Sequence, residues 1–155
     1  MPANSLQELV PFEINPANAP RFAARIVETM REVERIKLDY SVASIKKVDK
    51  ILDDYGGTKG VTPRKIAVTL FELGCYVGQV IIRHNRGAKW VLLPDDETES
   101  SLNSGLVVEL VTGTIINPIG KVEKRLVNGD GDYLPHFYQM VETIDDEDDD
   151  EGESD

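Results

Sequence analysis

The hydrophobic residues of the N-terminal half recur at helical spacing in three stretches. The first is predicted to form a helix from Pro20 to about Leu38, with charged residues on its opposite face. The second follows a break at Ser41, a residue type that caps helices, and is predicted to end at Gly56. The apolar face of the first helix is formed by Phe22, Ile26, Val27, Met30 and Val33.

The third stretch contains two glycines inside a strong helical pattern. Thr62 and Pro63 fit an N-cap and the first helical position, and Gly87 fits a C-terminal stop. Gly74 and Gly78 lie four residues apart and therefore on one face of the helix. Each costs about 1 kcal/mol relative to alanine in a helix interior. We expect close packing of the sheet or of the second helix to compensate for this cost.

After Gly87 the pattern changes from helical spacing to short apolar runs separated by turn residues. These runs predict three strands, with an acidic loop between the first two. The predicted strands and loop cover 88–94, 95–101 (loop), 105–111 and 113–118.

Two further helices are predicted after the strands. The first has Asn117 as its N-cap, Pro118 at its first position and Gly129 as its stop, and the second runs from about Tyr133 to Ile144. The order predicts an α+β fold with an N-terminal three-helix segment, a three-stranded, mainly antiparallel sheet and two short C-terminal helices.

Charge divides the chain unevenly. The 155 residues carry a net charge of −11, but nine of the acidic residues lie in the last segment, DDEDDDEGESD. The rest of the chain has 17 basic and 19 acidic residues, a net charge of −2. Runs of like charge repel and bury nothing. We therefore expect an irregular N-terminal arm (1–17), a single α+β domain (18–144) and a disordered acidic tail (145–155).

Cysteine content and hydropathy bear on the cellular compartment. Cys75 is the single cysteine, so an internal disulfide is impossible, and its mid-helix position predicts a buried, inert thiol. The sequence contains no secretory signal pattern and no run of 18 apolar residues. We expect a soluble, cytoplasmic protein that does not enter a membrane.

Familiar catalytic and metal-binding patterns are absent from the sequence. It has two histidines and none of the motifs H-E-x-x-H, C-x-x-C or G-x-S-x-G. The segment NGDGD begins like a calcium loop, but Tyr133 and Gln139 stand where a glycine and a glutamate are needed. We expect no catalytic residues, no metal and no cofactor, and a protein that is not an enzyme.

Basic residues near the ends of two helices form the candidate binding site. If the two groups meet in space, they would hold a carboxylate or a phosphate. The alternative is that they only neutralise helix ends and cover a solvated face. The candidate ligand-binding residues are Arg83, His84, Arg86, Trp90, Lys121, Lys124 and Arg125.

Two functions of different classes fit these features. The first is a non-enzymatic protein-binding module, such as an immunity- or antitoxin-like inhibitor or an adaptor, whose acidic tail attracts a basic protein. The alternative is a domain that uses the basic residues to bind an anionic small ligand or to hydrolyse it. Nucleic-acid binding is not expected, because the acidic tail would oppose contacts with phosphates. In the alternative interpretation, the acidic tail only increases the solubility of the protein and binds no partner.

Three segments resemble small uncharacterised bacterial domains: LDYSVASIKKVDKILDD, GCYVGQVIIRHNRGAKW and NPIGKVEKRLVNGDGD. In those domains a G-x-Y-x-G-x-V-I helix precedes a tryptophan-bearing strand and then an N-P helix with a K-R pair. Gln79 stands where such a domain is expected to carry glutamate. The resemblance implies an α+β fold and carries no established activity. The matching residues are Gly74, Tyr76, Gly78, Val80, Ile81, Trp90, Asn117, Pro118, Lys124 and Arg125.

Overall fold

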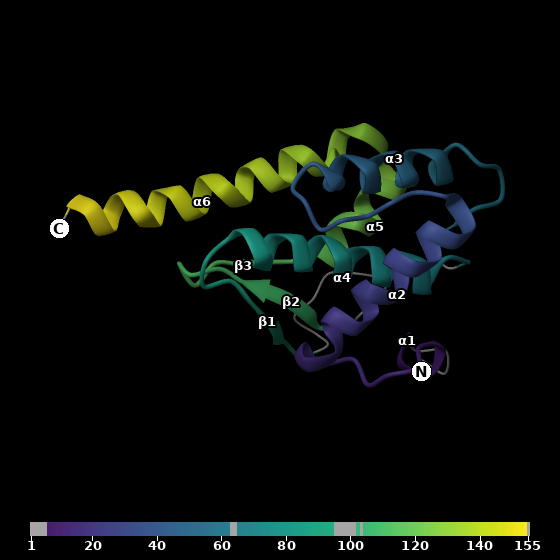
Figure 1. Ribbon diagram of the computed structural model, residues 1–155, viewed down its shortest axis with the longest axis horizontal. Helices are drawn as coiled ribbons and strands as arrows, with labels where there is room; N and C mark the ends of the chain where they lie inside the picture. Colours follow the sequence, from purple (N-terminus) through teal and green to yellow (C-terminus); the bar gives the residue numbers. More distant parts are fainter. Residues whose placement is uncertain (1–5, 63–64, 95–101, 103, 155) are drawn as a thin grey trace.

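The computed structural model describes residues 6–62, 65–94, 102 and 104–154, and side chains as far as Ile144. It confirms the α+β class. Along the chain, helices come first, the three strands of one sheet follow, and two further helices come last (Figure 1). The α-helices are α1 (Leu6–Leu9), α2 (Ala19–Thr29), α3 (Ser44–Gly56), α4 (Ala67–His84), α5 (Pro118–Asn128) and α6 (Leu134–Ser154). The strands are β1 (Lys89–Leu92), β2 (Leu106–Glu109) and β3 (Ile115–Ile116). Short helical turns are η1 (Pro16–Asn18), η2 (Met30–Glu34) and η4 (Gly129–Asp132).

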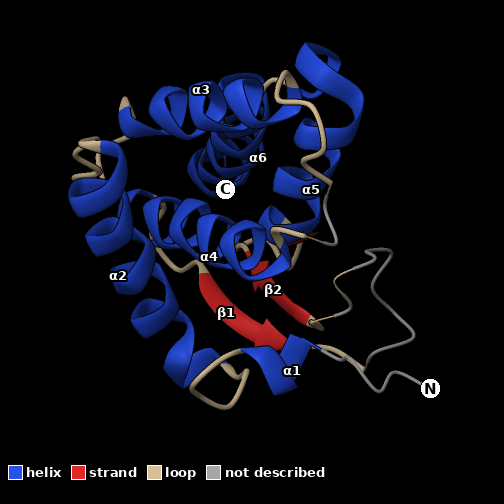
Figure 2. Ribbon diagram, turned by 90° about the vertical axis from the view of Figure 1, so that its right-hand side faces the viewer, coloured by secondary structure: helices blue, strands red, loops and turns tan. Residues whose placement is uncertain are grey.

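Helix α4 lies at the centre of the molecule. Every residue from Leu70 to Ile81 is buried, because α2, α3, α5 and the sheet surround the helix (Figure 2). A helix that is buried all round needs small residues where its neighbours approach closely. Gly74 and Gly78 serve this purpose, as the sequence predicted.

The two glycines contact different neighbours. A β-carbon added at Gly78 would overlap the six-membered ring of Trp90 in β1. A β-carbon at Gly74 would lie 2.5 Å from the Cα of Ile119 in α5. The sheet, one of the two alternative neighbours predicted, packs at Gly78, whereas the neighbour at Gly74 is α5, which was not among the predicted elements.

The sheet is antiparallel with the strand order β1-β2-β3. Trp90 pairs with Val108 and Val108 pairs with Ile116, so these side chains share the face that packs on α4. Successive strand residues alternate between faces. Val107 and Ile115 therefore lie on the opposite, outer face.

The first helix ends sooner than predicted. After Thr29 the chain forms the π-helix η2, and Arg35 then adopts a left-handed conformation with φ of 59°. The wider π turn changes the direction of the side chains that follow. As a result Val33, which was predicted to be part of the apolar face, is 69% exposed.

The predicted caps before α3 and α5 are present, whereas the start of α4 and the end of α6 differ from the prediction. The Oγ of Ser41 accepts a hydrogen bond from the Ser44 amide (3.1 Å), and Asn117 accepts one from the Gly120 amide (2.9 Å). Helix α4 begins at Ala67 rather than at Pro63, which lies outside the described residues together with the predicted acidic loop. The backbone of α6 continues to Ser154. The division into an arm, a domain and a disordered tail stays a prediction.

A buried ion pair connects α3, α5 and the start of α6. The guanidinium of Arg125 donates to Asp49 (Nε to Oδ1, 2.7 Å) and to Asp53 (Nη2 to Oδ1, 3.1 Å). Asp49 also accepts a hydrogen bond from the Leu134 amide at 3.0 Å. The side chains of Arg125 and Asp49 are only 4% and 8% exposed. Asp49 therefore depends on Arg125 for its counter-charge.

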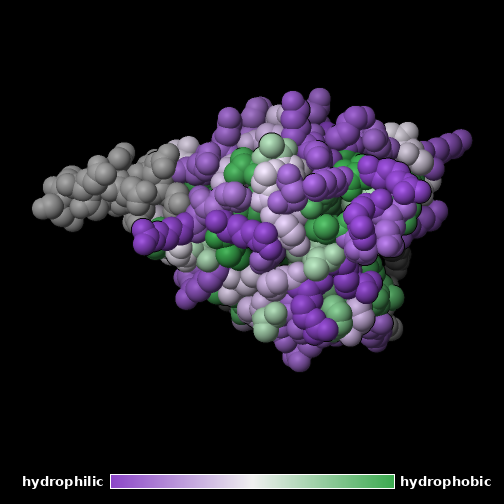
Figure 3. Space-filling model, viewed as in Figure 1, coloured by the Kyte–Doolittle hydropathy of each residue, from purple (hydrophilic) through white to green (hydrophobic). Residues whose placement is uncertain are grey.

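The surface seen from the side of Figure 1 is mainly hydrophilic, with small and separate hydrophobic areas (Figure 3). Within the described residues, no helix combines the length and the apolar character needed to cross a membrane.

Candidate functional site: a cavity at the edge of the sheet

A cavity of about 340 Å3 lies beside β3, between the sheet and the helices α5 and α6. Its volume falls at the lower end of the range of roughly 300–1,000 Å3 that is usual for small-ligand sites. The lining residues are Leu93, Val107, Ile115, Ile116, Asn117, Gly120, Lys121, Lys124, Asp132 and Phe137.

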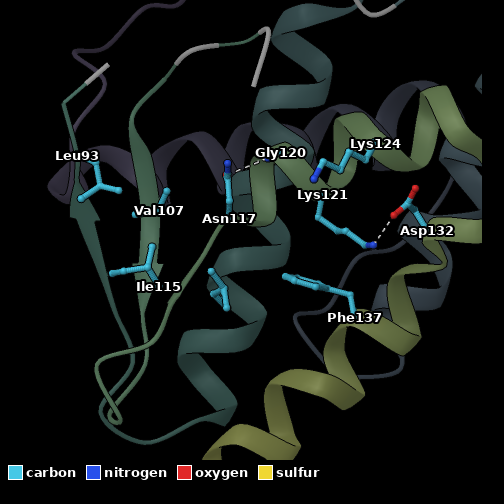
Figure 4. Close-up of a pocket in the computed structure, with 10 residues that line it drawn as sticks. Leu93, Val107, Ile115, Asn117, Gly120, Lys121, Lys124, Asp132 and Phe137 are labelled. Carbon is cyan, nitrogen blue, oxygen red and sulfur yellow. Dashed lines mark hydrogen bonds and ion pairs between the residues drawn. The ribbon is translucent and has the colours of Figure 1, made fainter. Parts of the chain in front are cut away.

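The cavity has two chemically different halves (Figure 4). On one side, Leu93, Val107 and Ile115 present only hydrocarbon, and they come from the end of β1, from β2 and from β3. On the other side, α5 contributes the ammonium groups of Lys121 and Lys124.

The polar half contains one internal ion pair. Lys121 Nζ lies 2.7 Å from Asp132 Oδ1, and the Asn128 amide donates to the other oxygen of Asp132 at 2.9 Å. These two hydrogen bonds, first that from Lys121 and then that from Asn128, lower the pKa of Asp132, with a smaller contribution from the nearby charge of Lys124. Asp132 is therefore ionised at neutral pH, and the three charged lining residues sum to one positive charge.

Local sequence explains why these groups meet. A single residue, Asn117, separates β3 from α5, so the first turn of the helix must lie beside the strand. Lys121 and Lys124 are three residues apart and share one face of α5. Gly129 ends α5 with φ of 78°, and the turn η4 then brings Asp132 back to Lys121. Phe137 follows on α6, with its ring centroid 5.9 Å from Lys121 Nζ.

Of the seven predicted site residues, only Lys121 and Lys124 line this cavity. Arg125 is held by Asp49 and Asp53, and Trp90 is buried against α4, where its Nε1 donates to Gln79 Oε1 at 2.8 Å. Both side chains have structural partners within the protein, and a ligand-binding role for them stays a prediction.

The remaining predicted residues lie near the C-terminal end of α4. The Arg83 guanidinium stacks over the ring of Tyr40 at 3.7 Å, and His84 Nε2 lies 2.9 Å from the Tyr40 carbonyl oxygen. Arg86 is exposed. A ligand-binding role for these residues stays a prediction, and the described contacts do not join the seven residues into one patch.

Tyr40 itself is fixed by a hydrogen-bonded chain. Its amide donates to the hydroxyl of Tyr76 at 2.8 Å, which lies 2.6 Å from Ser44 Oγ. Ser44 Oγ donates its single proton to the Ser41 carbonyl, so Tyr76 is the donor to Ser44. The chain satisfies each of these polar groups and holds Tyr40 in a left-handed conformation with φ of 64°.

The predicted burial of Cys75 is confirmed. The thiol is fully enclosed, and burial, with a smaller effect of the Glu72 charge, raises its pKa well above the usual value. A neutral, enclosed thiol is a poor nucleophile.

Sequence reasoning missed most of the cavity lining. Asn117 was predicted only as a helix cap, and the apolar strand residues only as parts of strands. The sequence did contain one signal for this site. A strand is followed by a single asparagine and then by a helix with two lysines on one face. What the sequence lacked was the position of β3 at the edge of the sheet.

The fold and the site thus define a class of protein. It is an α+β domain that has, at the edge of its sheet, a cavity with one apolar and one basic half. A model of DUF6278, a family of unknown function, matches residues 24–116, and the chain belongs to this family. The match includes the strand half of the cavity and ends at Ile116, shortly before α5, the helix that carries both lysines. No curated protein and no solved structure matches the chain.

Proposed function

We propose that this protein binds a small anionic amphiphile, a monocarboxylate with an apolar tail, in the cavity beside β3. The proposal rests on one observation: an apolar half and a half with a net charge of +1 meet in one cavity of about 340 Å3. A carboxylate placed near Lys124 gains a charge-assisted hydrogen bond. A hydrocarbon tail that extends over Val107 and Ile115 leaves water.

Octanoate is the first probe, measured by isothermal titration calorimetry. We expect affinity to rise from hexanoate to octanoate by about fourfold per buried methylene, because each contributes about 0.8 kcal/mol. Octanol, which has the same tail and no charge, should bind at least about tenfold more weakly, since hydrogen bonds to charged groups contribute about 1.5–3 kcal/mol. Equal binding of octanol and octanoate would contradict the proposal.

Variants of the basic half provide the sharper test. Lys124→Gln should weaken octanoate binding at least about tenfold, because it removes the lysine that has no described ion pair. Asp132→Asn should strengthen binding, because it releases Lys121 and raises the charge of the lining to +2. Lys46→Gln, an exposed lysine on α3, is the matched control and should leave binding unchanged. No effect of Lys124→Gln and Asp132→Asn would exclude this cavity.

A second candidate function is binding of a basic protein through the acidic end of the chain. The supporting observation is that α6 extends beyond the body of the molecule, and that residues 145–154 at its end carry eight of the nine clustered acidic residues (Figure 1). Attraction of this kind steers encounter and weakens as salt screens it.

Deletion of residues 145–155 tests the second candidate. Affinity capture is carried out with the full chain and with a form that contains residues 1–144. At low salt, the full chain should recover basic partner proteins and the shortened form should not. The same partners, at the same strength and with the same salt dependence for both forms, would rule out a role of the tail.

A further inference from the structure

We propose that the carboxylate which the cavity takes is the C-terminal end of an extended peptide, and that the peptide pairs with the open edge of β3. This inference rests on the proposed function and names the source of its ligand. The inference requires that N–H and C=O groups of β3 face the cavity and are not already hydrogen-bonded to β2. It also requires that the two lysines lie at the end of β3 where the peptide carboxylate would be.

The hydrogen-bonding pattern shows which way the backbone of Ile115 points. Leu110 donates to the Thr114 carbonyl at 2.8 Å, and the register places Glu109 opposite Ile115 and Val108 opposite Ile116. Opposite residues in an antiparallel pair alternate between bonded and non-bonded. Since Leu110 and Thr114 are bonded, Glu109 and Ile115 are not. The N–H and C=O of Ile115 therefore point away from β2.

The open edge of β3 borders the cavity. Ile115 belongs to the outer face of the sheet and Ile116 to the inner face, yet both line the cavity, which therefore wraps around this edge. β3 is the last strand in the order β1-β2-β3, and the described residues provide no further strand beside it. An unpaired edge is a template for a peptide strand.

The charges fix the direction of the peptide. β3 leads through Asn117 into α5, so Lys121 and Lys124 lie beyond the C-terminal end of the strand. A peptide that runs parallel to β3 brings its terminal carboxylate to these lysines. Its last side chain then enters the cavity near Phe137, and this position favours an apolar residue. The net charge of +1 matches one terminal carboxylate.

The test uses N-acetylated hexapeptides with mixed residues at the first five positions and Leu, Ile, Val or Phe at the last. Binding is measured by fluorescence polarisation with the free acids and with the C-terminal amides. We expect the amides to bind at least about tenfold more weakly. Equal binding of acids and amides would overturn the inference.

Ile115→Pro isolates the edge of β3. Proline removes an N–H that points away from β2, a position at which edge strands tolerate it. Ile115→Val is the matched control, because it shortens the side chain and keeps the N–H. We expect Ile115→Pro to weaken peptide binding about fivefold or more relative to Ile115→Val, because one hydrogen bond between the peptide and the edge of β3 is lost.

The outcomes separate the two proposals. If octanoate binds and the free-acid peptides do not, the peptide inference is wrong and the proposed function stands. If neither binds, both are wrong. If the peptides bind equally to Ile115→Pro and Ile115→Val, pairing with the edge of β3 is excluded.

Discussion

Replacing Arg125 with methionine will lower the free energy of unfolding by about 3–5 kcal/mol, measured by urea denaturation at pH 7. The variant removes the counter-charge of Asp49, a carboxylate whose side chain is 8% exposed. The Leu134 amide would remain as a partner of Asp49, and one neutral donor does not compensate a buried charge. The loss is a large fraction of the 5–15 kcal/mol that stabilises an average domain.

Two further variants separate this effect from simple loss of a positive charge. Lys50→Met removes an exposed cation that pairs with Asp54 one turn away on α3, and such pairs contribute at most about 1 kcal/mol. The double variant Asp49→Asn/Arg125→Met should regain part of the stability lost in Arg125→Met, because no buried charge is then left alone. A loss in Arg125→Met as small as that in Lys50→Met would mean that Asp49 finds solvent or another cation.

The burial of Arg125 was not predicted from the sequence. This residue was grouped with Lys121 and Lys124 because all three are basic and close in the chain. Ile119, Val122 and Leu126 define the apolar face of α5, and Arg125 follows Val122 by three residues, so helical spacing already put it toward the core. The signal was present, and residue type was given more weight than position.

Other features could not be read from the chain. The short apolar run within 113–118 predicted a strand but not its place at the edge of the sheet, because strand order depends on contacts between distant segments. The π-helix at Met30 leaves no comparable pattern, since its residues fit an α-helix equally well. The predicted faces were therefore more reliable than the predicted neighbours.

Gly74 and Gly78 also show that the sequence predicts a packed helix face more reliably than the element that packs on it. Two glycines four residues apart predicted close approach of other elements, and both are closely packed. Periodicity identifies the face that is covered, and it does not identify the element that covers it. Hence the sheet, which packs at Gly78, was among the predicted neighbours of this face, whereas α5, which packs at Gly74, was not.

Gly78→Leu is expected to lower the free energy of unfolding by about 1–3 kcal/mol, because the new side chain must displace the Trp90 ring. The better helix propensity of leucine offsets up to about 1 kcal/mol of the packing cost. The ring cannot move freely, since its Nε1 is hydrogen-bonded to Gln79 in the same helix. Trp90 is the single tryptophan of the chain, so a red shift of its fluorescence in the folded variant would report its displacement directly.

Gly131→Leu is the matched control for Gly78→Leu, because a β-carbon at Gly131 meets nothing within 4 Å. Its stability and fluorescence should stay close to those of the parent protein. The contrast between the two glycines links local backbone to overall architecture: an absent side chain is essential only where a neighbour occupies its space. If Gly78→Leu unfolded at the same denaturant concentration as the parent protein, with unshifted fluorescence, Trp90 would not pack on α4, and β1 would lose the contact that positions the sheet and its cavity.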